Sequence, residues 1–351
     1  MAKQCIGLDI GSSSIKLVQL KMTRKGLILQ NFGIEPLPPQ SIVDGAVMNH
    51  GAIVDALKTL TSRIHLRGKS VAMAVSGNAA IIKRLTIPHM EGAALDEQME
   101  WEVQQNIPYA REEVFVDHTV LVEQTPEGQM EVLLAAAKKE IVEQYMHVIQ
   151  DAGLQVDVID TAAFAVQNAV ESSVGFAPGE TVAVINVGAT FSTLNIVSNG
   201  MPVFTRDVSA AGNTYTEAIQ QWLAVSLEGA EAYKVGGASA AGADVVPQEV
   251  HRILAQVSEQ VAGEFQRSLD FYVSDAVDAH LSRIILTGGT ALVPQLPKAV
   301  QDRARIPVHI LDPFARVDVD ERRFDVNYLK TNAPIAGVAF GLALRQLGDA
   351  R

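Results

Sequence analysis

The sequence is poor in cysteine, in charged residues and in long apolar runs. Its single cysteine, Cys5, excludes an intrachain disulfide framework and a cysteine-rich zinc site. Charged residues make up only 19% of the 351 residues and hydrophobic residues 48%, which excludes the disordered class of protein. The longest apolar runs, such as 132–137, are far shorter than the ~20 residues that span a bilayer. We therefore expect a folded protein without a membrane-spanning helix.

The length and the charge narrow the class of protein further. The chain is long enough for two domains, each with its own hydrophobic core. Its net charge of −12 argues against non-specific binding to nucleic acid or to an anionic membrane face. The N-terminal residues MAKQCIGLDIG lack the charged and apolar segments of a signal peptide, so we expect a cytoplasmic protein.

One strand-turn-strand sequence pattern occurs twice in the chain. Residues 6–18 (IGLDIGSSSIKLV) and 183–197 (AVINVGATFSTLNIV) each predict an apolar strand, a turn of glycine and small polar residues, and a second strand. Asp9 and Asn186 stand at equivalent positions, about half of the chain apart. The duplication predicts two similar α/β lobes that present these turns to a shared cleft.

The two turns carry groups that suit a phosphate. Gly11 and Gly188 let the backbone approach an anion, because glycine has no side chain. Lys16 adds a positive charge, and Asp9 suits a water-mediated Mg²⁺ ligand, since Mg²⁺ keeps much of its hydration shell. Further hydroxyl or N–H donors are Ser12, Ser13, Ser14, Ala189 and Thr190. Either turn alone is better explained as a hairpin in a core sheet; the pair favours phosphate binding.

A third glycine turn follows the predicted strand at 284–287. Gly288 and Gly289 leave backbone that can lie flat against a base or an α-phosphate, with Thr290 beside them. Other nucleotide motifs are absent from the sequence: position 63 is not the glycine that a P-loop ending at 68–70 would need, and no G-x-G-x-x-G follows the first strand. The three turns, in this order, predict a nucleotide site between two lobes.

The pattern also predicts an inserted unit. Residues 88–158 alternate as α-β-β-α-β, unlike their surroundings. We expect a first lobe at 1–87 and 159–178, this inserted subdomain, a second lobe at 179–334 with a small-residue loop at 236–247, and a closing segment at 335–351 that packs back on the first lobe.

These motifs resemble the actin, Hsp70 and sugar-kinase superfamily, whose ATP lies between two duplicated ribonuclease-H-like lobes. DIGSSSIK resembles its first phosphate loop, INVGATFST its second and LTGGTALVPQL its adenosine motif. Within the superfamily the sequence is most similar, over nearly the whole chain, to the PilM family of type IV pilus assembly proteins. The resemblance implies an α/β, two-lobed fold with an FtsA-like small subdomain inserted in the first lobe.

The resemblance also implies ligands and roles for single residues. The protein would bind ATP or ADP with Mg²⁺. Asp160 and Asn186 would position the attacking water, while Glu231 and Lys234 would hold ribose and adenine. Gly212 would join the residues that bind the nucleotide.

The partners implied by the resemblance belong to the pilus machine. The N-terminal cytoplasmic tail of PilN, a single-span inner-membrane protein, would dock in a groove beside the inserted subdomain. PilO and PilP would be linked indirectly, and the motor ATPases and PilC would lie nearby. The protein would be recruited to the inner membrane through these partners, without inserting into the membrane itself. The resemblance leaves open whether it forms a ring-shaped homo-oligomer.

One departure from the family pattern bears on catalysis. Asn186 stands where the second phosphate loop usually has Asp, and Ala189 replaces a common polar residue. An amide cannot supply negative charge to a Mg²⁺-bound water, and phosphoryl transfer depends on such electrostatics. We expect slow or absent hydrolysis.

Two other classes of protein remain open. A sugar or carboxylate kinase needs a catalytic Asp that faces a substrate hydroxyl, but Asp44 and Asp55 fall in a predicted loop and on a helix face. An FtsA-like cell-division protein or an actin-like filament ATPase shares the same loops. FtsA-like anchoring would need a C-terminal amphipathic helix, whereas the tail FGLALRQLGDAR runs directly from the predicted closing helix.

Overall fold

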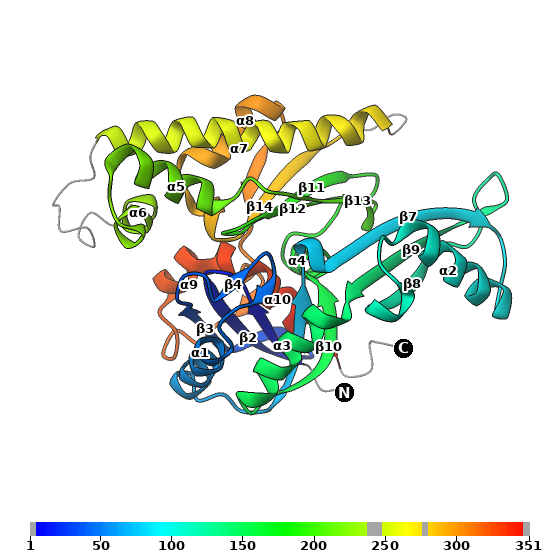
Figure 1. Cartoon of the computed structure of the whole chain (residues 1–351), viewed down its shortest axis with the longest axis horizontal. Helices are drawn as coiled ribbons and strands as arrows, with labels where there is room; N and C mark the ends of the chain where they lie inside the picture. Colours follow the sequence, from blue (N-terminus) through cyan, green and yellow to red (C-terminus); the bar gives the residue numbers. More distant parts are fainter. Residues whose placement is uncertain (1–4, 237–247, 276–279, 347–351) are drawn as a thin grey trace.

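The structure, a computed structural model, describes residues 5–236, 248–275 and 280–346. Two sheets face each other across helices α4 (Ala162–Ser173) and α10 (Gly337–Ala343), and further helices cover their outer faces, so helix and sheet layers alternate (Figure 1). One hydrophobic core joins both sheets through the alanine-rich faces of α4 and α10. Within the described residues, no helix combines the length and apolarity needed to cross a bilayer.

The first sheet contains the first of the two predicted hairpins. Its six strands, in spatial order, are β10 (Gln155–Thr161), β6 (Ser70–Val75), β1 (Ile6–Ile10), β2 (Ser14–Thr23), β3 (Gly26–Pro36) and β16 (Val317–Asp318). Helices α1 (His50–Arg63) and α3 (Lys139–Asp151) bury their apolar faces on its outer side. Strand β3 extends this sheet beyond the hairpin that the sequence predicts. A short hairpin, β4 (Ile42–Val43) and β5 (Ala46–Val47), precedes α1.

The second sheet repeats the hairpin. Its strands, in spatial order, are β13 (Met201–Val208), β12 (Ser192–Ser198), β11 (Thr181–Val187), β14 (Arg283–Thr287) and β15 (Val308–Ile310). The helices of this lobe are α5 (Gly212–Leu223), α6 (Leu227–Lys234), α7 (Gln248–Asp275) and α8 (Gln295–Ala304). The heptad-like apolar positions of α7 face this sheet and form its core. Residues 237–247, most of the predicted small-residue loop, lie outside the described residues.

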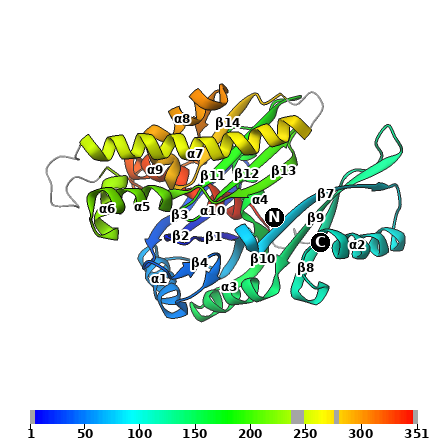
Figure 2. The same ribbon diagram turned by 45° about the horizontal axis from the view of Figure 1, so that its top comes forward.

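A separate three-stranded sheet projects from the side of the first lobe (Figure 2). Its strands are β7 (Ala80–Pro88), β9 (Gln129–Lys138) and β8 (Val114–Val122), and α2 (Ala93–Asn106) packs on one face through Met99 and Val103. This sheet begins before residue 88. Helix α3 and strand β10, which the sequence pattern assigned to the inserted unit, instead pack on α1 and pair with β6. Their apolar residues complete the core of the first lobe.

The described part of the predicted closing segment, residues 335–346, lies between the lobes, and residues 347–351 lie outside the described residues. After α9 (Val326–Asn332), α10 packs against α4 and β1, and two glycines make this close approach possible. A Cβ atom on Gly7 would overlap the carbonyl oxygen of Ala339, and one on Gly341 would overlap that of Ala165. Short 3₁₀ turns cover Gly77–Ala79, Arg111–Glu113, Gly289–Leu292 and Ala333–Ala336.

Candidate functional site

The first predicted turn, between β1 and β2, has an ion pair next to its glycine. Asp9 and Lys16 are directly opposed on β1 and β2, and their side chains form an ion pair of 3.2 Å. The backbone N–H of Gly11 donates to the carbonyl oxygen of Ser14, which closes the turn. A Cβ atom on Gly11 would lie 2.8 Å from Lys16 Nζ, so the ammonium group occupies the space that this glycine leaves. Ser13 is exposed at the tip of the turn.

The second turn has the same backbone and different side chains. Gly188 N–H donates to the carbonyl oxygen of Phe191 at 3.1 Å, which matches the bond in the first turn. Asn186 and Thr193 occupy the positions of Asp9 and Lys16. The predicted duplication is therefore present in three dimensions, with a neutral pair in the second lobe where the first has a charged one.

A direct hydrogen bond joins the two turns. Thr190 Oγ1 donates to Ser12 Oγ at 2.7 Å, although the residues belong to different lobes. Two hydroxyl groups predicted to bind phosphate thus meet where the lobes face each other. This contact places the two predicted phosphate turns at one site.

The other glycine turns converge on the second phosphate turn. Gly212 N–H and Thr290 Oγ1 both donate to the carbonyl oxygen of Gly188, at 3.0 and 2.7 Å. Gly288 has φ +89°, and a Cβ atom there would lie 2.7 Å from Asn186 Oδ1, so only glycine fits. Gly289 is exposed, and a Cβ atom on it would have no neighbour within 4 Å. Its backbone is therefore open to a ligand.

The predicted ribose and adenine residues lie next to this cluster. Lys234 Nζ donates to Glu231 Oε1 at 2.6 Å, to Thr216 Oγ1 at 3.0 Å and to the carbonyl oxygen of Gly212 at 3.4 Å. Lys234 is nearly buried and its protons are used inside the protein, whereas the Glu231 side chain is 44% exposed. Of this pair, Glu231 is the residue placed to contact a ligand.

Asp160 has a different environment. It lies at the end of β10, where its Oδ2 is 3.6 Å from Arg345 Nε and its Oδ1 accepts the backbone N–H of Thr161. The structure thus places Asp160 beside a cation from the closing segment. Its role in positioning a water stays a prediction.

A second carboxylate faces the interior and was not found from the sequence. Asp207 on β13 is directly opposite Thr193, whose hydroxyl donates to it at 2.6 Å. Burial of the site raises the pKa of Asp207, and the Thr193 hydrogen bond opposes that rise. The sequence signal was incomplete: Asn199-Gly200 predicts a tight hairpin turn, and counting back from it sets Arg206 opposite Thr193. An irregularity between Ile196 and Val197 shifts the register by one residue and brings Asp207 there instead.

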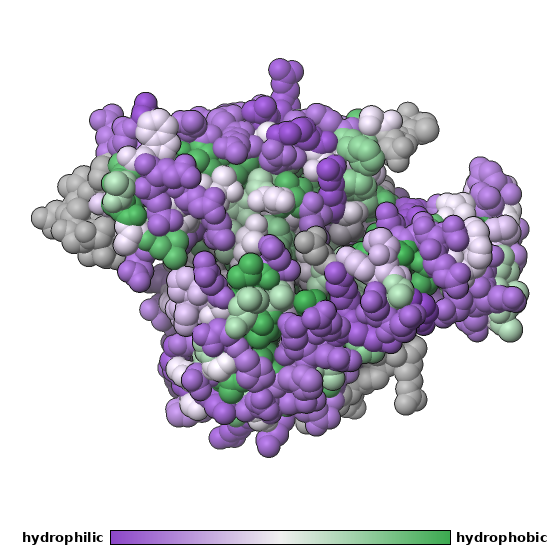
Figure 3. Space-filling model, viewed as in Figure 1, coloured by the Kyte–Doolittle hydropathy of each residue, from purple (hydrophilic) through white to green (hydrophobic). Residues whose placement is uncertain are grey.

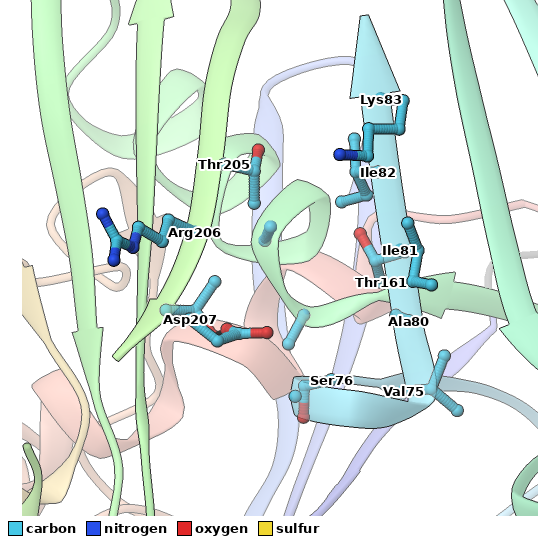
Figure 4. Close-up of a pocket in the computed structure, with 14 residues that line it drawn as sticks. Val75, Ser76, Ala80, Ile81, Ile82, Lys83, Thr161, Thr205, Arg206 and Asp207 are labelled. Carbon is cyan, nitrogen blue, oxygen red and sulfur yellow. Dashed lines mark hydrogen bonds between the residues drawn. The ribbon is translucent and has the colours of Figure 1, made fainter. Parts of the chain in front are cut away.

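Asp207 lines a cavity where three parts of the protein meet. The cavity, of about 220 Å³, lies between the end of β6, the start of β7, the start of α4 and the end of β13. Figure 4 shows Asp207 and Thr161 turned toward it from opposite sides, with Ile82 and Lys83 above, whereas Arg206 points away. Apolar side chains of β7 and α4 form much of its wall.

The three glycine turns fit a polyphosphate and a hydrated cation. They offer backbone N–H groups, hydroxyls and one ammonium group around a small region with exposed backbone. In the described part of the chain there is no group of three or more His, Cys, Asp or Glu side chains that could hold a metal alone. A Mg²⁺ ion here would take Asp9 together with water and phosphate oxygens, as Mg²⁺ sites on nucleotides commonly do.

Known proteins resemble this chain over almost its whole length. A family model described as type IV pilus assembly protein PilM matches residues 7–347. A chain of the solved PilM-PilN type IV pilus biogenesis complex has 27% identity and a TM-score of 0.87, covering 98% of this chain and 99% of that chain. The predicted resemblance to the PilM family is confirmed.

Two more distant structures share the fold. The ethanolamine utilization protein EutJ from Carboxydothermus hydrogenoformans has 14% identity and a TM-score of 0.59, over 98% of this chain and 90% of that chain. MreB5 of Spiroplasma citri bound to AMPPNP has 13% identity and a TM-score of 0.52, over 98% and 96%. They confirm the predicted two-lobed α/β fold class. With a family model that spans nearly all of its residues, this chain belongs to the type IV pilus assembly protein PilM family.

Proposed function

We propose that this protein is the cytoplasmic, nucleotide-binding component of a type IV pilus assembly machine, and that it binds the N-terminal tail of PilN. The observation that carries this function is the whole-chain likeness to a chain of the PilM-PilN complex, at 27% identity and a TM-score of 0.87. Through PilN, the protein is recruited to the inner membrane and linked indirectly to PilO and PilP. The motor ATPases and PilC are its further neighbours in this proposal.

The nucleotide of this proposal is ATP or ADP with Mg²⁺, held between the two lobes. The support is the convergence of the glycine turns and the Thr190–Ser12 hydrogen bond between them. When bound, the nucleotide supplies a phosphate chain that completes the Mg²⁺ coordination. Lys16 neutralises phosphate charge, Gly289 leaves room beside its backbone, and Glu231 faces the ribose and adenine end.

Slow or absent hydrolysis is part of the same proposal. Asn186 is neutral at the position equivalent to Asp9. Asp160, the other predicted water-positioning residue, lies 3.6 Å from Arg345, so its carboxylate faces a cation of the chain itself. The chain's own residues therefore bind and orient a nucleotide better than they activate a water.

We place the PilN tail in the groove beside the inserted sheet, and the cavity lined by β7 and the start of α4 as part of that groove. The apolar wall that Ile82 contributes suits a short apolar segment. A peptide there would touch both lobes and the inserted sheet. Peptide binding and nucleotide binding are then expected to affect each other, because each ligand contacts both lobes.

The test is a titration of fluorescent ATP, with and without a synthetic PilN tail peptide. We expect Mg²⁺-dependent nucleotide binding, binding of the peptide, and a change in nucleotide affinity when the peptide is present. Ile82→Glu should weaken peptide binding and leave nucleotide binding to the peptide-free protein unchanged. Ile310→Glu, at a 44% exposed apolar residue on β15, is the matched control and should change neither.

Two results would contradict the proposal. Failure to retain the PilN peptide, with the protein folded by circular dichroism, would remove the pilus partner. Retention of an FtsZ tail peptide instead would favour the cell-division alternative.

A further inference from the structure

The first lobe has a concentration of positive charge that the net charge of −12 conceals. Residues 10–34 contain four Lys and Arg residues and no Asp or Glu, and residues 56–69 contain another four and again no Asp or Glu. The inserted sheet and its helix, residues 80–138, carry eleven acidic residues against four basic ones. The two segments are therefore basic within an acidic chain, although α3, β10 and α4 of the same lobe carry six acidic residues against one lysine.

The fold brings the two basic segments to one edge. The turn between β2 and β3 and the loop between α1 and β6 both lie at the amino ends of the parallel strands β1 and β6. Gln19 Nε2 donates to the carbonyl oxygen of Arg67 at 2.9 Å, which joins the two segments. We call the exposed cations here the basic edge: Lys21, Arg24, Lys25, Arg67 and Lys69.

Among the residues that the structure describes, the cations of the basic edge form no ion pairs with nearby carboxylates. In the described residues, none of its five cations forms an ion pair of 4.0 Å or less. Glu35, at the other end of β3, pairs with Arg63 instead. Asp157 accepts hydrogen bonds from Ser70 and Gln155. Asp318 lies in register with Lys21 on the other side of Ile28, and the five exposed cations of the edge outnumber Asp157 and Asp318.

The surface beside these cations suits a lipid headgroup. A hollow of about 480 Å³ lies between the end of α1 and the loop after α3, and its lining includes Lys69, His65 and the polar residues Thr61 and Ser62. Met22 lies between Lys21 and Arg24 in the sequence, and its side chain is 48% exposed. Figure 3 shows hydrophilic side chains along the lower margin of the molecule, which the first lobe forms.

We propose that the basic edge binds the surface of an anionic lipid bilayer and orients the protein on it. Salt screens charges beyond about 8 Å at physiological ionic strength, so a membrane against this edge interacts with local cations and hardly with the acidic inserted sheet. Anionic leaflets attract clusters of basic residues in this way. The sequence-based expectation that an acidic protein avoids anionic membranes then fails locally, because it averaged over two regions of opposite charge.

The proposal stands apart from the nucleotide and peptide sites, and its test uses neither ligand. The full-length protein is sedimented with vesicles of phosphatidylcholine containing phosphatidylglycerol, and with vesicles of phosphatidylcholine alone. We expect binding only to the anionic vesicles, and at least tenfold weaker binding when salt is raised from low to high concentration.

The variant Lys25→Glu/Lys69→Glu changes one cation in each basic segment and should reduce vesicle binding about tenfold or more. Lys298→Glu/Arg305→Glu makes the same change in total charge on the exposed surface of the second lobe and should reduce binding less than twofold. Both variants should keep the nucleotide affinity and unfolding curve of the parent protein.

Three results would overturn the proposal. One is the absence of binding to anionic vesicles, and another is an equal loss of binding in the two charge variants, which would mean that total charge alone matters. In the third, the basic-edge variant binds vesicles normally but loses self-association in size-exclusion chromatography with light scattering, or loses binding to RNA. The edge would then serve a second copy of the chain or a nucleic acid.

Discussion

The β1–β2 and β11–β12 turns share one backbone hydrogen-bond pattern but carry different side chains. In both, a glycine N–H donates to the carbonyl oxygen three residues later, at 3.1 Å. The first turn places a carboxylate opposite an ammonium group, Asp9 and Lys16, whereas the second places an amide opposite a hydroxyl, Asn186 and Thr193. The duplicated fold thus fixes the position of the ligand-facing groups and leaves their charge free to differ.

The difference assigns separate roles to the two lobes in the proposed site. A charged pair can neutralise phosphate and order a hydrated cation, while a neutral pair can only donate and accept hydrogen bonds. The first lobe therefore supplies electrostatic attraction, and the second supplies shape and backbone contacts through Gly188 and its neighbours Gly212 and Thr290. Substitutions in the two turns test this division.

The largest effect on stability is expected from Gly188→Ala. A Cβ atom there would lie 2.7 Å from the backbone oxygen of Phe191, so the turn itself must move, at a cost of about 2–3 kcal/mol in the free energy of unfolding. Gly11→Ala instead meets the flexible end of Lys16 and should cost less than ~1 kcal/mol. Urea unfolding of both variants measures the difference, and equal losses would show that the two turns are constrained alike.

The next effect concerns nucleotide affinity. Lys16→Met removes the ammonium group above Gly11 and should weaken ATP binding by about tenfold or more, since a hydrogen bond to a charged group contributes ~1.5–3 kcal/mol. Thr193→Val, at the equivalent position of the second lobe, should weaken it less than about twofold. Fluorescent ATP titration compares the two. A larger loss from Thr193→Val would reverse the roles assigned to the lobes.

Much of this arrangement follows from sequence alone, for reasons that particular residues make clear. The alternation of apolar residues around Gly11 and Gly188 sets both hairpins, and the apolar spacing along 248–275 sets the core helix α7. These are local patterns, and local patterns determine secondary structure. They also place the glycine turns at the ends of strands, where the two sheets bring them together.

The features that the sequence did not predict depend on pairing between distant segments of the chain. The local sequences of strands β7 and β10 do not decide which sheet each strand joins. Strand β7 joins the inserted sheet and β10 the first sheet, so the boundary of the insertion was misplaced. The ion pair of Asp160 with Arg345 joins residues from distant parts of the chain that no local spacing relates. The basic edge was hidden because composition sums charges that the fold separates.

A smaller effect should follow from making the two turns alike. Asn186→Asp restores a carboxylate opposite Thr193, and we expect ATP hydrolysis to rise by roughly tenfold from a slow basal rate, because a negative charge can then polarise a Mg²⁺-bound water. Asn186→Gln keeps the amide and is the matched control. Phosphate release under saturating ATP measures the effect; equal rates in all three proteins would place the barrier elsewhere, with the Asp160–Arg345 pair as the next site to vary.

The smallest effect is expected from Asp207→Asn, beside the neutral turn. Since burial raises the pKa of Asp207, the folded protein binds this proton more tightly than the unfolded chain does. The charged form therefore costs stability, and the contribution of Asp207 to wild-type stability falls as pH rises from the ordinary Asp value, about 3.9, through the higher folded pKa. The asparagine still accepts the Thr193 hydrogen bond and carries no charge. The variant should thus be more stable than wild type by less than ~1 kcal/mol at neutral pH, with the gap closing near pH 3. Urea unfolding at both pH values tests the sign; a variant that is less stable at neutral pH would show that the second lobe needs this charge after all.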